Sequence, residues 1–321
     1  SVEGEDEPDS EWLIRRARIG IRAHVAGWIA AYVEGDFGRG TARLTDGYVD
    51  LEFDPRFELR TGQFKVPFDE LEFISSRELP VIERDGLPRG AAGFTPNSLL
   101  DDLGYNSRDI GVRWSGSWDR WSAAAGVFNG SGDNEPDIDD GKQLAARLTI
   151  DLGGTWRLAG AWTGIRVSEP PDPEAVGATW YQAAELAVTA GEYAEPGWRL
   201  LGQSFVGENY DPEVLGDDDA TFVALQGIAS YHIPLYRTPY LIAWEPVLRL
   251  AWTRIDDAFV ADPAPVDGLA VDPGEAETTL ATAGVNLYWR EYAVTQVQLD
   301  WLDAEPGGSD VAFRLQVGLG F

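Results

Sequence analysis

Residues 310–321 read DVAFRLQVGLGF, and along this stretch the side chains alternate strictly between two kinds. The large apolar set is Val311, Phe313, Leu315, Val317, Leu319 and Phe321. The residues between them are polar or small, namely Ala312, Arg314, Gln316, Gly318 and Gly320. A period of two is that of a β-strand, whose successive side chains point to opposite faces. The apolar face lies either in the core of a soluble sandwich or in the lipid around a membrane barrel.

Similar stretches recur along the whole chain at intervals of about 20 residues, the length of one strand of about ten residues with its connection. The sequence therefore predicts an all-β protein with one domain over residues 1–321. The expected strands are residues 12–24, 27–35, 42–53, 56–65, 108–116, 119–128, 142–151, 154–165, 177–189, 197–206, 219–231, 239–255, 277–289, 292–302 and 310–321.

The connections between these strands favour the barrel over the sandwich. Short turns, such as Asp54-Pro55 and Gly153-Gly154, alternate with the long acidic stretches 129–141, 207–218 and 257–276. In a sandwich, nothing requires the short connections to lie at one end and the long connections at the other. An outer-membrane barrel has short periplasmic turns and long external loops. We therefore predict a transmembrane antiparallel β-barrel in the bacterial outer membrane.

Fifteen expected strands is an odd number, whereas single-chain bacterial barrels have an even number. If the C-terminus is periplasmic, the strand over 12–24 runs toward the periplasm, and an ascending strand is expected before it. We predict sixteen strands, the first absent from this chain or one of the others split or missed. The chain also lacks Met, even at position 1, which fits an exported protein that has lost a signal peptide.

The composition excludes several classes of protein. The chain carries 54 Asp and Glu against 25 Lys and Arg, a formal net charge of −29, whereas a nucleic-acid partner needs a basic surface. It has no Cys, which excludes disulfides, thiol nucleophiles and Cys-based metal sites. No apolar run approaches the roughly 20 residues of a membrane-spanning helix, which excludes an α-helical membrane protein.

The sequence offers no catalytic or cofactor motif. Its two histidines, His24 and His232, lie far apart and outside any HExxH-like pattern, and no nucleophile elbow is present. The acidic runs at 133–140 and 217–219 lack the order of a calcium-binding loop. We therefore expect no enzyme, no cofactor and no metal site.

Aromatic residues lie near many ends of the expected strands: Trp12, Trp28, Trp118, Trp156, Trp198, Tyr240, Trp289 and Tyr292. They fit an aromatic girdle at the level of the lipid headgroups. Cross-strand packing of aromatic rings in an ordinary sheet is the alternative.

Assigning the apolar residues to the lipid side places a set of arginines on the inner face, where they avoid a cost of about 2–4 kcal/mol for lipid exposure. These predicted pore-lining residues are Arg16, Arg18, Arg22, Arg60, Arg113, Arg147, Arg157, Arg199, Arg249 and Arg314. They form either a cationic lumen that attracts anions or ion pairs with inward carboxylates. The carboxylates available are Asp46, Asp50, Glu52, Glu58, Glu185, Glu245 and Asp300.

Residues 66–107 are too long for a turn and contain no clear strand, and loops of this length are usually functional or disordered. We predict a loop that folds into the barrel and narrows it, with an external flap as the alternative. The predicted constriction residues carry mixed charges: Lys65, Arg77, Glu78, Glu83 and Arg84.

Several motifs resemble the phosphate-selective porin O and P family. They are RRARIG (15–20), GQFKVPF (62–68), IERDG (82–86), RDIGV (108–112) and GVFNGSG (126–132), and their order and spacing also match. The likeness spans roughly residues 12–165 and implies a sixteen-stranded barrel, a homotrimer and a loop folded into each pore. It also implies that the RRAR strand is the second. Phosphate-specific members line the constriction with lysines, and Lys65 alone remains here.

The function expected from these features is a porin that passes small hydrophilic solutes or ions, anions among them, by passive diffusion. The expected partners are outer-membrane lipid and further copies of the chain. The terminal Phe321 resembles the aromatic signal that outer-membrane assembly reads. One alternative is a structural or adhesive barrel with a plugged lumen, and another is a β-rich exported hydrolase.

Overall fold

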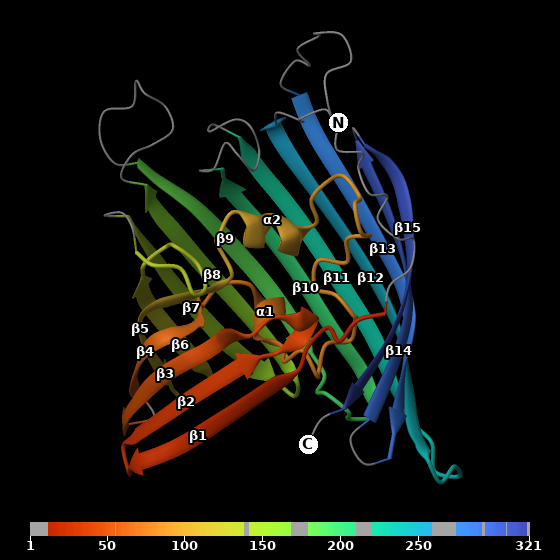
Figure 1. The fold of residues 1–321 in the computed structure, drawn as a ribbon, viewed down its shortest axis with the longest axis horizontal. Helices are drawn as coiled ribbons and strands as arrows, with labels where there is room; N and C mark the ends of the chain where they lie inside the picture. The colour runs from red at the N-terminus through yellow and green to blue at the C-terminus, as the bar shows by residue number, and fades with distance from the viewer. Residues whose placement is uncertain are drawn as a thin grey trace.

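The computed structural model describes residues 12–54, 56–137, 141–167, 179–209, 220–258, 274–290, 293–305 and 307–319. Fifteen strands form one antiparallel sheet (Figure 1). The first five are β1 (Arg18–Ala26), β2 (Ile29–Asp36), β3 (Arg43–Asp54), β4 (Phe57–Lys65) and β5 (Arg108–Ser117). The next five are β6 (Trp121–Phe128), β7 (Lys142–Gly153), β8 (Trp156–Val167), β9 (Thr179–Ala190) and β10 (Gly197–Glu208). The last five are β11 (Thr221–Pro234), β12 (Leu241–Ala258), β13 (Gly274–Trp289), β14 (Ala293–Glu305) and β15 (Gly308–Leu319).

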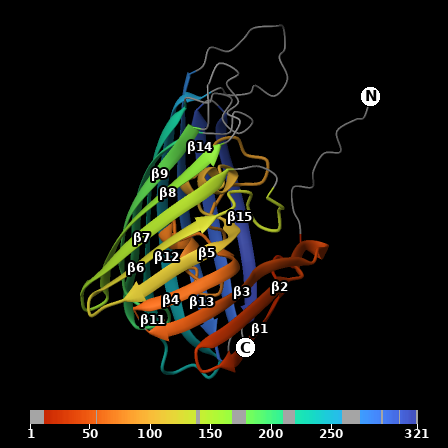
Figure 2. The same cartoon turned by 90° about the vertical axis from the view of Figure 1, so that its left-hand side faces the viewer.

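Each strand pairs with its neighbours in sequence, so the order across the sheet runs from β1 to β15 without a crossover. Figure 1 and the view turned by 90° in Figure 2 show the sheet curling around its own interior. In the part of the chain that the structure describes, β1 and β15 are the two edges and do not pair with each other. The predicted all-β barrel architecture is confirmed, and the sixteenth strand stays a prediction.

All fifteen expected strands are present, and most of their ends agree within a few residues. The clearest error is the first strand, which was expected from residue 12 and begins at Arg18. Residues 12–17 leave the sheet and bind the turn after β2 instead. The Arg39 N–H donates to the carbonyl of Ile14 at 2.7 Å, and the Phe37 N–H donates to that of Ala17 at 2.8 Å. Arg16 therefore precedes β1 and does not lie on it.

The segment 66–107 folds into the interior, as predicted, and carries two short helices, α1 (Glu70–Phe73) and α2 (Pro96–Asp102). Thr95 caps α2, because its side chain accepts from the Ser98 N–H while the Ser98 hydroxyl accepts from the Thr95 N–H. Proline at the first helical position supports the same start. Among the described residues, no helix is both long enough and apolar enough to cross a membrane.

The outer surface of the sheet is apolar over most of its extent. Exposed large side chains alternate along the strands with residues that face the interior, as Phe313, Leu315 and Val317 do on β15. Trp28, Trp156 and Trp198 are exposed at or near strand ends, as a girdle requires. A soluble sheet would bury such a face, whereas a barrel in a membrane presents it to lipid.

Candidate functional site

The inward-folded segment, here called the interior loop (residues 66–107), is held against one side of the barrel. On β8–β14, almost all inward side chains away from the short-turn ends are buried. We call this inner face the covered wall. The inner faces of β1–β5, here called the open wall, keep most of their side chains partly accessible. The candidate site consists of the inward side chains of the open wall and of the loop residues that lie near them.

Four of the predicted pore-lining arginines hold the interior loop. Arg199 on β10 donates to the carbonyl of Glu78, and Arg314 on β15 donates to that of Leu87. Arg249 on β12 donates to the carbonyls of residues 83 and 85, at 3.0 and 3.3 Å, and is only 1% exposed. These carbonyls lie in non-helical backbone and need donors when buried. Here the guanidinium groups supply them.

The fourth arginine, Arg147 on β7, belongs to a buried carboxylate cluster at the start of the loop. It donates to Glu185 on β9 at 3.0 Å and also contacts Glu70 in α1. Glu185 in turn accepts from the backbone N–H groups of Asp69 and Glu70 at 3.0 and 2.7 Å. The side chain of Gln203 donates both to Asp69 and to Glu185, at 2.7 and 2.9 Å. One strand carboxylate therefore fixes the beginning of α1.

Asp69 is fully buried and has a φ of 68°, a left-handed conformation that costs energy in a residue other than glycine. Its carboxylate accepts from the Leu71 N–H at 3.0 Å and from the amides of Asn97 and Asn106 at 2.5 and 2.9 Å. Burial, together with repulsion from Glu185, raises the pKa of Asp69 to about 7. The Asp69 carboxylate therefore joins the start of the loop to Asn97 and Asn106 near its end.

Amide side chains hold the middle of the loop. Asn286 on β13 donates to the carbonyl of residue 80 at 2.9 Å, and Gln296 on β14 donates to that of residue 79 at 3.1 Å. Gln298 accepts from the Ile82 N–H at 2.8 Å. An amide can donate and accept at once, so it satisfies either backbone group without adding charge to a buried interface.

Apolar contacts complete the attachment. Leu99, Leu100 and Leu103 of the α2 region are fully buried in a cluster with Phe205 and Phe222 from the covered wall. A second cluster joins residues 71, 79 and 81 to residues 201, 228 and 247, and a third holds residues 87 and 91 against 251, 280 and 302. Burying each large side chain contributes roughly 1.5–3 kcal/mol. The loop is thus a packed layer on the covered wall.

Two glycines allow the loop to lie this close. A Cβ atom on Gly86 would come within 2.5 Å of Leu280 and 2.9 Å of Arg249. A Cβ atom on Gly93 would come within 2.5 Å of the Thr278 hydroxyl. Both glycines have positive φ, at 69° and 95°, which only glycine adopts freely.

The remaining strand arginines near this space lie on the open wall with tyrosines and carboxylates. Arg60 binds Asp50 through two hydrogen bonds of 2.6 and 3.0 Å, and its guanidinium stacks 3.7 Å from the ring centre of Tyr48. Arg22 approaches the same carboxylate at 3.6 Å and donates to the Tyr48 hydroxyl at 2.9 Å. Its side chain is 42% exposed. Two cations therefore share one carboxylate beside accessible space.

Two further arginines of the open wall are also paired. Arg18 binds Asp36 at 2.9 Å, and Arg113 lies 3.6 Å from Glu58. Of the predicted pore-lining set, Arg157 is exposed at the short-turn end of β8. Arg16 lies before β1, where burial lowers the pKa of its guanidinium, as does the nearby Arg15.

The predicted constriction residues separate into three contacts. Lys65 and Arg84 both bind Glu72, with Lys65 at 3.7 Å and Arg84 at 3.1 Å. Glu83 forms an ion pair with Arg15, which also donates to the Ile82 carbonyl at 3.0 Å. Arg77 and Glu78 lie 4.0 Å apart and are more exposed than the others. The segment before β1 therefore reaches across to the tip of the interior loop.

Several residues with clear roles were not singled out from the sequence. Arg15, Asp69 and Glu72 form contacts within or to the loop, and Arg108 on β5 binds Asp46 on β3 at 3.0 Å. The inward glutamines were a usable signal. Strand parity places Gln143, Gln203, Gln226, Gln296 and Gln298 inside, and all five are buried. So many inward amides indicate that this wall binds buried backbone groups and does not face only water.

One buried polar cluster lies in the covered wall near its short-turn end. His232 Nδ1 is 3.5 Å from a Glu245 oxygen, which also accepts from the Tyr288 hydroxyl. The rings of His232 and Tyr288 are 4.8 Å apart. Within the described ranges, no three His, Cys, Asp or Glu side chains are grouped to hold a metal ion. Phe321, the predicted assembly signal, lies outside the described residues.

A family model agrees with this geometry. Residues 2–155 match the model described as phosphate-selective porin O and P. The match includes the motifs on which the resemblance was based and confirms it. Among curated proteins, none matches the chain.

Solved structures with the same fold are outer-membrane proteins. The high-pH structure of Pseudomonas putida OprB aligns with a TM-score of 0.63 at 10% identity, over 95% of this chain and 87% of that one. The outer membrane channel DcaP of Acinetobacter baumannii gives 0.57 at 12% identity, over 94% and 84%. A trimer form of Vibrio cholerae OmpT gives 0.53 at 14% identity, over 90% and 81%.

Identities this low establish the fold alone, whereas the family match adds the sequence pattern of the first half. The short turns, the apolar outer face and the inward loop on a wall of arginines and amides agree with both. The chain is therefore a porin-type β-barrel of the bacterial outer membrane, and its residues 2–155 match the model of the phosphate-selective porin O and P family.

Proposed function

We propose that this barrel lets small hydrophilic solutes diffuse passively through the space between the interior loop and the open wall. The observation that carries the proposal is the unequal burial of the two walls. The inward side chains of β8–β14 are buried beneath the loop, whereas those on β1–β5 stay partly accessible. The loop narrows the lumen from one side only. No chemical step is needed, and the family and fold are those of channels.

We place the constriction of this path beside the loop, where charged groups of both signs lie. Glu72 of the loop lies between Arg84, also of the loop, and Lys65 at the end of β4, and the pair of Arg22 and Arg60 with Asp50 lies on the open wall. The ion pairs reduce the positive potential that the arginines would create alone. Because two guanidinium groups share Asp50, some positive charge remains. We therefore propose a weak preference for anions and no specificity for phosphate.

We further propose that three copies assemble. The trimer form of the structurally similar OmpT supports this number. Cross-linking of the purified barrel with a short bifunctional reagent is the direct check, and a ladder that ends at two copies would refute a trimer.

A plugged lumen is the second candidate, and a specific observation favours it. The loop makes hydrogen bonds to β7 and to each strand from β9 to β15, so it fills a large part of the interior. A barrel closed in this way would be structural or adhesive.

Single-channel recording in a planar bilayer separates the two functions. A porin gives stepwise, persistent conductance, and a potassium chloride gradient gives a small reversal potential of the sign expected for anions. Folded, heat-resistant barrels that insert without conductance would refute the pore and support the plugged barrel. Clear cation selectivity at every salt concentration would refute the proposed role of the open wall.

A further inference from the structure

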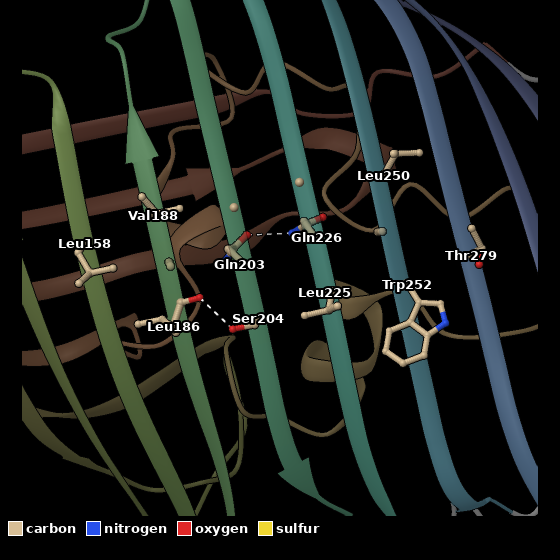
Figure 3. A pocket seen from close by; sticks show the side chains of 14 residues that line it. Leu158, Leu186, Val188, Gln203, Ser204, Leu225, Gln226, Leu250, Trp252 and Thr279 are labelled. Atoms are coloured by element: carbon tan, nitrogen blue, oxygen red, sulfur yellow. Dashed lines mark hydrogen bonds between the residues drawn. The ribbon is translucent and has the colours of Figure 1, made fainter.

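On the outer face of β8–β13, a groove of about 620 Å³ lies in the membrane-facing surface. Its walls are mostly apolar side chains, with Leu158, Leu186 and Val188 at one end and Leu225, Leu250 and Trp252 at the other (Figure 3). A volume of this size falls in the range of roughly 300–1,000 Å³ that holds small ligands. It lies behind the covered wall and takes no part in the proposed pore.

The floor of the groove is a pair of glycines on neighbouring strands. Gly202 on β10 is directly opposite Gly227 on β11. In the same row across the sheet, Val188 is opposite Gly202, and Leu250 is opposite Gly227. The next row on one side contains larger residues, because Leu225 is opposite Trp252. The surface therefore dips at the two glycines and rises beside them.

Neither glycine is required by the backbone. Neither Gly202 nor Gly227 has a positive φ. A Cβ atom on Gly227 would meet nothing within 4 Å, and one on Gly202 would meet only Val188, at 3.3 Å. Glycine inside a strand weakens it and often marks a place where a ligand or another backbone comes close. The pair is therefore better explained by what lies against it than by the fold of the barrel.

The length and direction of the groove fit a hydrocarbon chain. The row from Leu158 to Leu250 crosses four strand-to-strand steps, about 19 Å at the usual spacing of about 4.8 Å. One leaflet of a bilayer core is roughly 15 Å deep, and barrel strands tilt by roughly 35–45°, so a row perpendicular to them is inclined to the membrane. The groove is thus about one leaflet long.

The groove begins close to the short turns. Leu158 lies two residues after Trp156, where β8 starts, and Val188 lies two residues before β9 ends. Trp156 and Trp198 are exposed at this end, as expected at the level of the headgroups. Because short turns are periplasmic in such barrels, the groove opens to the periplasmic leaflet, which consists of glycerophospholipid.

We propose that this groove holds one acyl chain of a glycerophospholipid from the periplasmic leaflet, bound more durably than the surrounding lipid. The groove is continuous with the membrane interface of the barrel, and its apolar lining offers no counter-charge for a headgroup. Gly202 and Gly227 let the chain lie directly on the backbone of the strands. The headgroup then lies near Trp156 and Trp198.

The test replaces the open glycine and counts retained lipid. Gly227→Leu is expected to fill the groove, and because its Cβ atom meets nothing within 4 Å, we expect the barrel to fold normally. Ala146→Leu is the matched control, since Ala146 is exposed on the outer face of β7, outside the groove. Gly227→Ala is a milder second variant. Each barrel is purified in the same detergent and examined by native mass spectrometry.

The original barrel and Ala146→Leu are expected to retain one phospholipid per chain at collision energies that strip it from Gly227→Leu, with Gly227→Ala in between. Equal retention by all four barrels would overturn the proposal, as would lipopolysaccharide in place of phospholipid. Loss of oligomers in Gly227→Leu with unchanged lipid would assign the groove to a second copy instead. The bilayer conductance of Gly227→Leu is expected to be unchanged. Lipid retention and conductance therefore test the groove and the proposed pore separately.

Discussion

The covered wall and the open wall belong to one sheet, yet they use different polar chemistry. The covered wall binds the backbone of the interior loop with uncharged amides, with arginines that donate to carbonyls and with one buried carboxylate, Glu185, that accepts from N–H groups. The open wall pairs arginines with carboxylates and stacks them on tyrosines. Buried backbone groups must each find a partner, whereas charged pairs beside water lose little if one member moves. The comparison teaches that inward polarity alone does not identify a pore-lining residue.

Glu185→Ala is the change expected to have the largest effect. It removes the acceptor for two backbone N–H groups at the start of α1 and leaves Arg147 with less compensation. Breaking a buried pair costs about 3–5 kcal/mol. We expect the start of the loop to detach, with larger and noisier single-channel currents and a lower melting temperature.

Glu58→Ala is the matched control on the open wall. Glu58 is partly exposed and lies 3.6 Å from Arg113, so its loss should cost about 0–1 kcal/mol. Equal loss of thermal stability in the two variants would show that the walls do not differ as described.

Gly93→Ala tests whether close approach to the covered wall matters. The added Cβ atom would lie within 2.5 Å of the Thr278 hydroxyl and 2.8 Å of Ala304. At Gly90, which also has a positive φ, a Cβ atom would meet nothing within 4 Å. Both alanine variants have the backbone strain of a positive φ, so they differ only in the clash at residue 93. We expect this clash to destabilise the attached loop by about 1–3 kcal/mol more in Gly93→Ala than in Gly90→Ala. Hydrogen exchange over residues 86–95 is the measurement, and identical exchange in both variants would contradict the prediction.

The attachment of the loop is expected to depend on pH. The carboxylates that face Asp69 are Glu185 and Glu72, and its four hydrogen-bond donors are the Leu71 N–H and the amides of Asn97, Asn106 and Gln203. Burial raises the pKa of Asp69 to about 7, so between about pH 4 and pH 7 the carboxyl group of Asp69 is protonated when the loop is attached. In a detached loop the same group is in water and has lost its proton over this pH range. The stabilisation is therefore complete below about pH 4 and is lost as the pH rises through 7.

Hydrogen exchange over 69–73 at pH 5 and pH 8, corrected for the intrinsic rate, measures this dependence. We expect faster local opening at pH 8 and no such difference in Asp69→Asn. Slower opening of the loop at pH 8 than at pH 5 would contradict this prediction. It would mean that the four hydrogen-bond donors stabilise the ionised carboxylate of Asp69 more than burial destabilises it.

The strands could be predicted because a membrane barrel repeats one local rule. Alternation along residues such as 310–321 indicates both the strand and which face each side chain lies on, and all fifteen expected strands are present. The first strand was misplaced because residues 12–17 bind the turn at 37–39 through backbone groups, which leave no trace in side-chain alternation. The start of α2 was not predicted, although Thr95-Pro96 is a helix start signal.

The division of the arginines could not be predicted, because parity says only that a side chain points inward. Parity assigns both Arg60 and Arg249 to the inner face, yet one pairs with Asp50 and the other donates to the carbonyls of residues 83 and 85. Which of these occurs depends on where a loop distant in sequence comes to rest. The interior loop was expected from its length, whereas its partners on the wall follow from three-dimensional packing.

The smallest expected effect is the most direct test of the open wall. Arg60→Ala removes one of the two cations on Asp50, and Arg22 at 3.6 Å is left to balance this carboxylate. We expect the permeability ratio of cation to anion to rise about two- to fivefold, equivalent to roughly 0.4–1 kcal/mol. Arg56→Ala makes the same change of charge at an exposed short turn outside the lumen. Because salt screens exposed charges within about 3 Å at 1 M, that control is expected to leave the reversal potential unchanged. If both variants shift it equally, the charge of the whole barrel sets selectivity, and the open wall has no special role. If only Arg60→Ala shifts it, ions pass beside Asp50, and the path through the barrel follows the open wall.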